Sequence, residues 1–275
     1  MRYKWKMQTY TLDTRKISQP VCLAIASDLH GCAYGEKQRE LLDAIDSQKP
    51  NAVLMVGDMS DARDDDTPFW EFLTGAAALA PCYYVTGNHE FGRNSRYDCF
   101  SEETVKRQKE EIRRMGIHVL EGEKELLCGS GGQVAVMGMD DELVGKGEFN
   151  RQYLRCCQMT ERGQYTILLS HRPEKLGAYR YFPGDLVVCG HAHGGQWRLW
   201  GARGGVYAPG QGLFPRYAGG LYPRGQGFLL VSCGLCYKYP KIPRFGNPPE
   251  LVILRLNPAG KEQETAKKNS GKKNR

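Results

Sequence analysis

VCLAIASDLH, residues 21–30, joins an apolar run to an aspartate and a histidine. Residues 21–27 have the length and apolar character of a buried strand, and Asp28 and His30 follow it directly. Further apolar runs along the chain end in the same way, before Asp58, Asn88, His171, and the pair His191 and His193. Ligands of open α/β sheets collect just outside the carboxyl ends of strands. We therefore expect these polar residues to meet in one crevice.

The rest of the chain predicts an α/β fold with mixed sheets flanked by helices. Helices are expected over residues 36–48, 68–79 and 101–115, the first with Leu41, Leu42 and Ile45 on one face. The second half is richer in predicted strands, and residues 194–227 form a long loop rich in Gly, Pro and aromatic residues. Loops of that length in compact domains are often functional.

Length and charge indicate one large domain, residues 1–258, followed by a basic tail, residues 259–275. The tail supplies +4 of the formal net charge of +7, which leaves +3 for the body and no strong nucleic-acid signal. We expect the tail to be disordered and to contact an anionic membrane weakly at most.

The absence of an N-terminal export signal predicts a cytoplasmic protein, in which the thiols stay reduced. The longest apolar stretch, residues 76–85, is too short to span a bilayer. Any membrane contact is therefore expected to be peripheral, at the inner face. Cys233 and Cys236 form a lone CxxC pair, which we interpret as two unreactive thiols.

The polar residues at the predicted strand ends suit a pair of metal ions. Aspartate, asparagine and histidine side chains favour Mn, Fe, Zn or Co over Ca or Mg, and no Cys belongs to the set. The predicted ligands are Asp28, His30, Asp58, Asn88, His171, His191 and His193. His89, in the sequence GNHE, is left over for another role.

The motif set DLH, GD, GNHE, a lone His and GHAH resembles the calcineurin-like metallophosphoesterase superfamily. GHAHGGQWR, RYAGGLY and PRFGNPPELVILRL are similar to its YkuE/YaeI-type phosphodiesterase branch. The resemblance implies a four-layer α-β-β-α sandwich of two packed mixed sheets. It also implies a small phosphorylated or phosphodiester substrate, with phosphodiesters favoured.

The resemblance implies a role for each matching residue. Asp28, His30 and His193 would hold one divalent metal ion, Asn88, His171 and His191 would hold the second, and Asp58 would bridge both. A hydroxide between the two ions would attack phosphorus in line with the leaving oxygen. His89 would act as general acid, oriented by Asp61, with Glu90 in a supporting part.

Other interpretations remain open at this point. Some proteins of this fold are non-catalytic metal-binding scaffolds or interaction proteins. Ala62 stands where phosphatase-like relatives place an Arg, and the acidic residues Asp64, Asp65 and Asp66 are expected to face solvent. Candidate substrate contacts are Gln196, Arg198, Arg203, Arg216, Tyr217 and Arg224, whereas Trp197 and Trp200 are expected to pack. The oligomeric state is not predicted.

Overall fold

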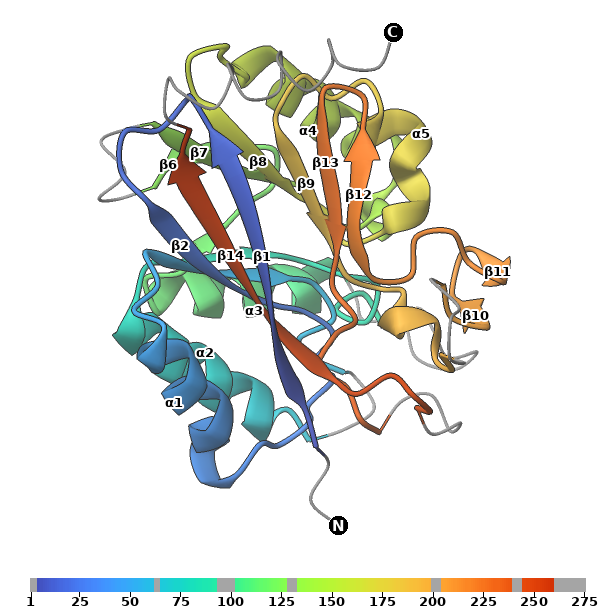
Figure 1. Cartoon of the computed structure of the whole chain (residues 1–275). Coiled ribbons are helices and arrows are strands. Elements are labelled where there is room, and N and C mark those ends of the chain that lie inside the picture. The colour runs from blue at the N-terminus through green and yellow to red at the C-terminus, as the bar shows by residue number, and fades with distance from the viewer. Residues whose placement is uncertain are drawn as a thin grey trace, which may run out of the picture.

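Two six-stranded sheets lie face to face in the computed structural model, which describes residues 4–61, 65–92, 102–127, 133–198, 204–238 and 244–259 (Figure 1). The first sheet has the order β1 (Lys6–Thr14), β14 (Glu250–Pro258), β2 (Val21–Ala26), β3 (Ala52–Val56), β4 (Cys82–Val85), β5 (His118–Val119). The second has the order β12 (Gly220–Arg224), β13 (Gly227–Val231), β9 (Leu186–Cys189), β8 (Tyr165–Leu169), β7 (Val134–Gly138), β6 (Lys124–Leu126). Both sheets mix parallel and antiparallel pairs.

Helices cover the outer face of each sheet. The helices α1 (Arg39–Ser47), α2 (Thr67–Leu79) and α3 (Glu102–Arg114) pack on the first sheet, and α4 (Lys146–Met159) and α5 (Leu176–Tyr179) pack on the second (Figure 1). This arrangement confirms the predicted four-layer sandwich. Among the described residues, no helix has both the length and the apolar character that crossing a bilayer requires.

The core between the sheets explains why the strands read as continuous apolar runs. In β2, Leu23 and Ile25 face the second sheet, whereas Ala24 and Ala26 face the helices. Because both faces of the central strands are covered, neither face needs polar residues. The strand ends, where polar residues begin, are therefore sharply marked in the sequence.

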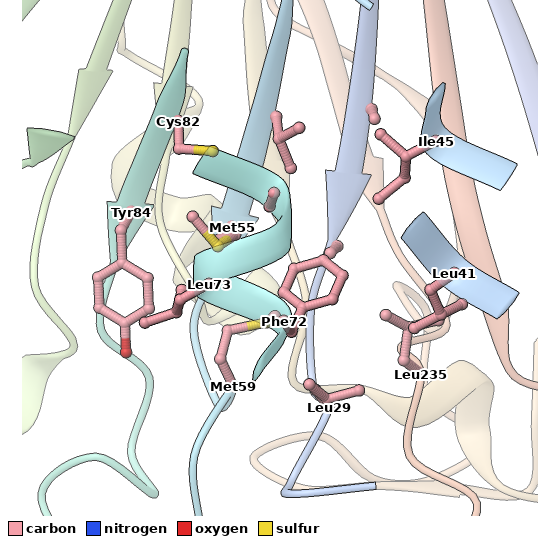
Figure 2. Close-up of a cluster of buried hydrophobic side chains, with 14 of the residues drawn as sticks. Leu29, Leu41, Ile45, Met55, Met59, Phe72, Leu73, Cys82, Tyr84 and Leu235 are labelled. Atoms are coloured by element: carbon pink, nitrogen blue, oxygen red, sulfur yellow. The ribbon is translucent and has the colours of Figure 1, made fainter. Parts of the chain in front are cut away.

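The helix-covered core of the first sheet is shown in Figure 2. Leu41 and Ile45 of α1 are buried there, as the predicted helical face requires, and Leu42 is partly buried. Phe72 and Leu73 of α2 belong to the same cluster of buried side chains. These contacts hold α1 and α2 against the strands that lead into the predicted site.

Several elements were not predicted from the sequence. The strand β1 lies at the edge of its sheet and alternates half-buried and exposed residues, so its apolar signal is weak. The helix α4 buries only Phe149, Gln152 and Cys156. The predicted loop 194–227 contains the short strands β10 (Tyr207–Ala208) and β11 (Gly212–Leu213) as well as β12. The tail beyond residue 259, and Ser101 at the start of a predicted helix, lie outside the described residues, and the single-domain boundary stays a prediction.

Candidate metal centre

The seven predicted metal ligands come together where strands of both sheets end. Strands β2, β3 and β4 of the first sheet lead into Asp28, His30, Asp58 and Asn88, and strands β8 and β9 of the second lead into His171, His191 and His193. All seven are between 0% and 3% exposed. We call these seven residues the donor cluster. So many buried polar side chains in one place demand compensating partners.

The backbone of the donor cluster is strained. Asp28, His30, Asp58, His191 and His193 have φ angles between 46° and 64°, in the left-handed region that favours glycine. Such conformations cost roughly 1–3 kcal/mol each and persist where the surroundings enforce them. The loops enforce them on each other, because the backbone N–H of His30 donates to the carbonyl of Asp58 at 3.1 Å.

Glycines precede three of the donor residues because the donor side chains fill the space beside them. A Cβ on Gly87 would lie 2.3 Å from Asp58 Oδ1, and a Cβ on Gly190 would lie 2.5 Å from Asp28 Oδ2. Real Cβ atoms essentially never approach that closely. The glycines of GD, GN and GH thus let neighbouring loops close around the aspartates.

The donor atoms form two groups, and a third possible metal-binding group, which consists of His30, Asp61 and His89, shares His30 with the first. Ligand atoms of Asp28, His30 and His193 all lie within 4.8 Å of one another, and so do those of Asp58, His171 and His191. Asp58 Oδ2 lies 3.0 Å from His171 Nε2 and 3.7 Å from His30 Nε2. One carboxylate oxygen therefore faces both groups.

The side-chain amide of Asn88 indicates whether a metal ion fits this centre. Its side chain is fully buried, and neither the amide oxygen nor the amide nitrogen has a hydrogen-bond partner in the described part of the chain. Leaving a buried polar group unpaired costs about 1–3 kcal/mol. Coordination of a cation by the amide oxygen would remove that cost, so the residues present fit a metal ion.

A hydrogen bond on the far side of the His171 imidazole orients that ring, and a carboxylate lies near the His191 imidazole without a hydrogen bond to its Nε2. His171 Nδ1 lies 2.8 Å from the carbonyl oxygen of Val56, which leaves Nε2 directed at Asp58. His191 Nε2 lies 3.7 Å from Glu174 Oε1, and its Nδ1 lies 3.2 Å from His171 Nε2. Partners of this kind fix the ring orientation of metal-binding histidines. Glu174 was not predicted, because nothing near it in the sequence marks it.

His89 stands beside the donor cluster and faces Asp61. His89 Nδ1 lies 3.2 Å from Asp61 Oδ2, and the same oxygen lies 3.4 Å from His30 Nδ1. The backbone N–H of His89 donates to Asp58 Oδ1 at 2.7 Å. Asp61 therefore contacts both His89 and a member of the donor cluster.

Glu90 is buried and ties two motif loops together. Its carboxylate accepts hydrogen bonds from the backbone N–H groups of Gly87, Asp58, Met59 and Ser60 and from the hydroxyl of Tyr84. Backbone donors around a carboxylate hold a loop in one geometry. Glu90 thus orders the loops after β3 and β4. The sequence analysis gave it only a supporting part beside His89.

Charges inside the centre are strongly coupled. Burial would raise the pKa of Asp58, but His171 and His89 hold that pKa well below its usual range. Burial opposes charge on His171, yet Asp58 raises its pKa to about 10. Burial holds the pKa values of His191 and His193 well below the usual range, so both are neutral near pH 7. Neutral imidazole is the form that binds a metal.

The candidate substrate contacts after the last motif differ in their burial and in their hydrogen-bond partners. Arg224 is buried and donates to the backbone carbonyls of Tyr179, Phe182 and Gly184, so it is structural. Arg198 donates to the carbonyls of Gly194 and Gly219. Gln196 is buried, Tyr217 packs against Tyr222, and Arg216 is exposed over the ring of Tyr217.

Three further predictions concern solvent exposure and thiols. Trp197 was expected to pack but is 43% exposed. Asp65 is exposed, whereas Asp66 is half-buried, and burial raises its pKa to about 6. Cys233 and Cys236 are buried, and Cys236 Sγ lies 3.8 Å from Cys32 Sγ. Ala62, Asp64, Trp200 and Arg203 lie outside the described residues.

Arg244 was missed by the sequence analysis and lies at the edge of the donor cluster. Its Nη2 is 3.5 Å from His193 Nδ1 and donates to the carbonyl of Gly234. Its Nε and Nη1 are buried and have no hydrogen-bond partner in the described ranges. Asn247 anchors this segment by donating to the carbonyl of His193 at 2.7 Å. Buried guanidinium donors beside such a centre suit an oxyanion.

Comparison with known proteins agrees with this geometry. A model of the family described as calcineurin-like phosphoesterase matches residues 23–195, and the chain belongs to that family. Phosphodiesterase YaeI of Escherichia coli (strain K12) is 28% identical over 211 residues, which cover 76% of this chain and 71% of that protein. An uncharacterized metallophosphoesterase of Aquifex aeolicus (strain VF5) is 27% identical over 94% of both chains. YkuE of Bacillus subtilis (strain 168) is 26% identical over 84% of this chain and 77% of that protein.

The predicted superfamily and branch are therefore confirmed. The chain is a metal-dependent phosphoester hydrolase whose buried His and Asp groups could bind metal. The interpretation as a non-catalytic scaffold is not favoured, because every predicted donor is present and buried in one region.

Proposed function

We propose that this protein is a dinuclear phosphodiesterase. The observation that carries the proposal is the position of Asp58 Oδ2, which faces a donor group on either side. Asp28, His30 and His193 would hold one divalent ion, Asn88, His171 and His191 would hold the other, and Asp58 would serve both. The donor set suits Mn, Fe, Zn or Co. Two such ions, when bound, activate a water molecule and polarise the phosphoryl oxygens.

His89 supplies the proton that the leaving alcohol needs. It is not a member of the donor cluster, and its Nδ1 lies 3.2 Å from Asp61 Oδ2. Asp61 orients the ring. A positioned general acid of this kind contributes about 10²–10⁴-fold to the rate.

Arg244 binds a non-bridging oxygen of the substrate phosphate. Its buried Nε and Nη1 need an acceptor, and its place beside His193 puts them next to one donor group. It would serve in place of the arginine that phosphatase-like relatives carry where this chain has Ala62. A diester carries one negative charge fewer than a monoester, which suits a centre with few cationic side chains. The name of the relative YaeI, a phosphodiesterase, supports the same preference.

Metal reconstitution tests the proposal. Protein stripped with a chelator should hydrolyse bis-p-nitrophenyl phosphate only after Mn, Fe, Zn or Co is added, with two ions bound per chain. Asp58→Ala should lose about 10³-fold or more in turnover and bind fewer than two ions, because the shared oxygen is gone. Asp46→Ala, an exposed aspartate on α1, is the matched control. Full occupancy of both sites in Asp58→Ala would contradict the proposal.

A further inference from the structure

The segment that follows the GHAH motif is free of acidic residues. Residues 191–249 contain seven Lys and Arg and no Asp or Glu. Because the tail supplies +4 of the total +7, residues 1–190 and 250–258 are together net −4. The positive charge of the folded body is therefore gathered in one segment that begins at the donor cluster.

The same segment exposes a group of large apolar side chains, which we call the apolar rim. It consists of Trp197 (43% exposed), Tyr207 (48%), Leu213 (68%), Phe214 (78%) and Phe245 (65%). Solvent exposure of one such residue is ordinary, but a group of them marks an interaction site.

Backbone hydrogen bonds join the members of the apolar rim. Tyr207 of β10 pairs with Leu213 of β11, and the N–H of Phe214 donates to the carbonyl of Val206 at 2.8 Å. The N–H of Val206 in turn donates to the carbonyl of Trp197, which forms a bridge with Phe245. The members of the rim are thus joined through one network of backbone hydrogen bonds.

Phe214 is held in a costly conformation. Its φ is 54°, in the left-handed region that bulky residues rarely adopt, and its ring is largely in solvent. Neither burial nor packing within the described chain offsets that strain. Strained and exposed apolar residues are characteristic of sites that contact a partner.

The segment that carries the rim packs against residues next to the donor cluster. The backbones of Gly195 and Gly205 touch, since a Cβ on Gly195 would lie 2.4 Å from Gly205 Cα. A Cβ on Gly210 would lie 2.3 Å from Glu174 Oε1, the oxygen that faces His191. Figure 1 shows β10 and β11 at the outer edge of the molecule. A surface seated on the rim would therefore present its headgroups close to the centre.

We propose that the apolar rim docks on an anionic lipid bilayer and that the donor cluster hydrolyses phosphodiesters of lipid headgroups there. Apolar side chains would enter the interfacial region, and Arg216 and Lys238, both exposed, would contact anionic headgroups. Aliphatic Leu213 beside Phe214 favours lipid over single-stranded nucleic acid, whose bases stack on aromatic rings.

The chemistry rests on the proposed function, whereas the docking does not. Water supplies one oxygen to phosphorus, one phosphorus–oxygen bond breaks, and the alcohol leaves with a proton. The docking surface and the hydrolytic centre can therefore be tested separately.

Vesicle sedimentation tests the docking. The metal-loaded full chain should bind phosphatidylcholine vesicles that contain phosphatidylglycerol better than vesicles of phosphatidylcholine alone. Replacing both Leu213→Ser and Phe214→Ser should weaken that binding about tenfold or more, because two apolar side chains no longer enter the interface. Leu154→Ser, a 57% exposed leucine on α4, is the control and should bind like the unchanged protein.

Two activity measurements separate docking from catalysis. Hydrolysis of phosphatidylglycerol in vesicles should fall with binding in the double variant, while hydrolysis of bis-p-nitrophenyl phosphate should stay unchanged. Equal binding of both vesicle types, equal binding by the double variant, or loss of single-stranded DNA binding instead of vesicle binding would overturn the docking. An unchanged protein that binds vesicles but hydrolyses no diester would refute the proposed function alone.

Discussion

The donor cluster and the apolar rim both contain residues with strained backbone conformations, but these residues are buried in the donor cluster and exposed in the rim. Asp58 has a φ of 52° and is 1% exposed, whereas Phe214 has a φ of 54° and is 78% exposed. Asp58 sits among buried partners, including Glu90, whose carboxylate accepts its backbone N–H. The backbone N–H of Phe214 donates to the carbonyl of Val206, and its ring lies largely in solvent. Hydrogen bonds with buried neighbours hold Asp58 in its strained conformation. Phe214 is strained and exposed, so its ring can contact a partner.

The two regions also differ in how far the family match covers them. The family match ends at residue 195, so it covers the donor cluster and stops before every member of the rim. Chemistry shared by a family thus lies in buried, tightly partnered residues. We propose that selection of a substrate, by contrast, falls to the exposed segment that follows. Four substitutions test this division, taken from the largest expected effect to the smallest.

His89→Ala should reduce turnover of bis-p-nitrophenyl phosphate by about 10²–10⁴-fold, because the leaving alcohol loses its proton donor. The metal content should stay unchanged, since His89 is not in the donor cluster. Elemental analysis and rate measurement on one preparation check both statements. His118→Ala, an exposed histidine on β5, serves as the control. An undiminished rate would remove His89 from the mechanism.

Glu90→Gln should lower the free energy of unfolding by about 2–3 kcal/mol, because the amide group cannot accept from all the donors that surround it. Urea denaturation of the metal-free protein measures the change. Glu111→Gln, at an exposed position on α3, should change stability little. A loss no greater than that of the control would show that Glu90 does not hold the loops.

Arg244→Ala should raise KM for a soluble diester about tenfold, because one charge-assisted contact to the phosphate is lost. Metal content should be retained. Arg216→Ala removes an arginine of the same segment that lies over Tyr217, and it should leave KM for the soluble diester unchanged. Equal effects of the two variants would place Arg244 outside the site.

Phe214→Gly should raise the free energy of unfolding by about 0.5–1 kcal/mol, because glycine adopts the left-handed conformation without strain. Leu213→Gly, one residue earlier, should instead lower it by a similar amount, since Leu213 has an ordinary φ. Thermal unfolding of both variants compares them. Destabilisation by Phe214→Gly would mean that the ring contributes to the fold and not to a partner surface.

Most of the fold and all seven members of the donor cluster could be predicted from local sequence patterns. Buried strands are uniformly apolar, so the change to Asp, Asn or His at each strand end stands out. Helix α4 and strand β1 were not predicted because their buried positions are few or alternate with polar residues.

Contacts between distant segments could not be predicted in the same way. Arg244 reaches His193 only because β14 pairs with β1 and β2 and brings residues 244–250 back to the donor cluster. Glu174 reaches His191 through the turn after β8. The exposure of Trp197 and Phe245 depends on how two irregular segments bridge. No local pattern in the sequence encodes such pairings.

The central claim is that two metal ions lie on either side of the Asp58 carboxylate. Anomalous diffraction from crystals of the manganese-loaded protein measures this directly. We predict two peaks about 3.5–4 Å apart, one near Asp28, His30 and His193 and the other near Asn88, His171 and His191. A single peak, or two peaks that do not share Asp58, would contradict the account.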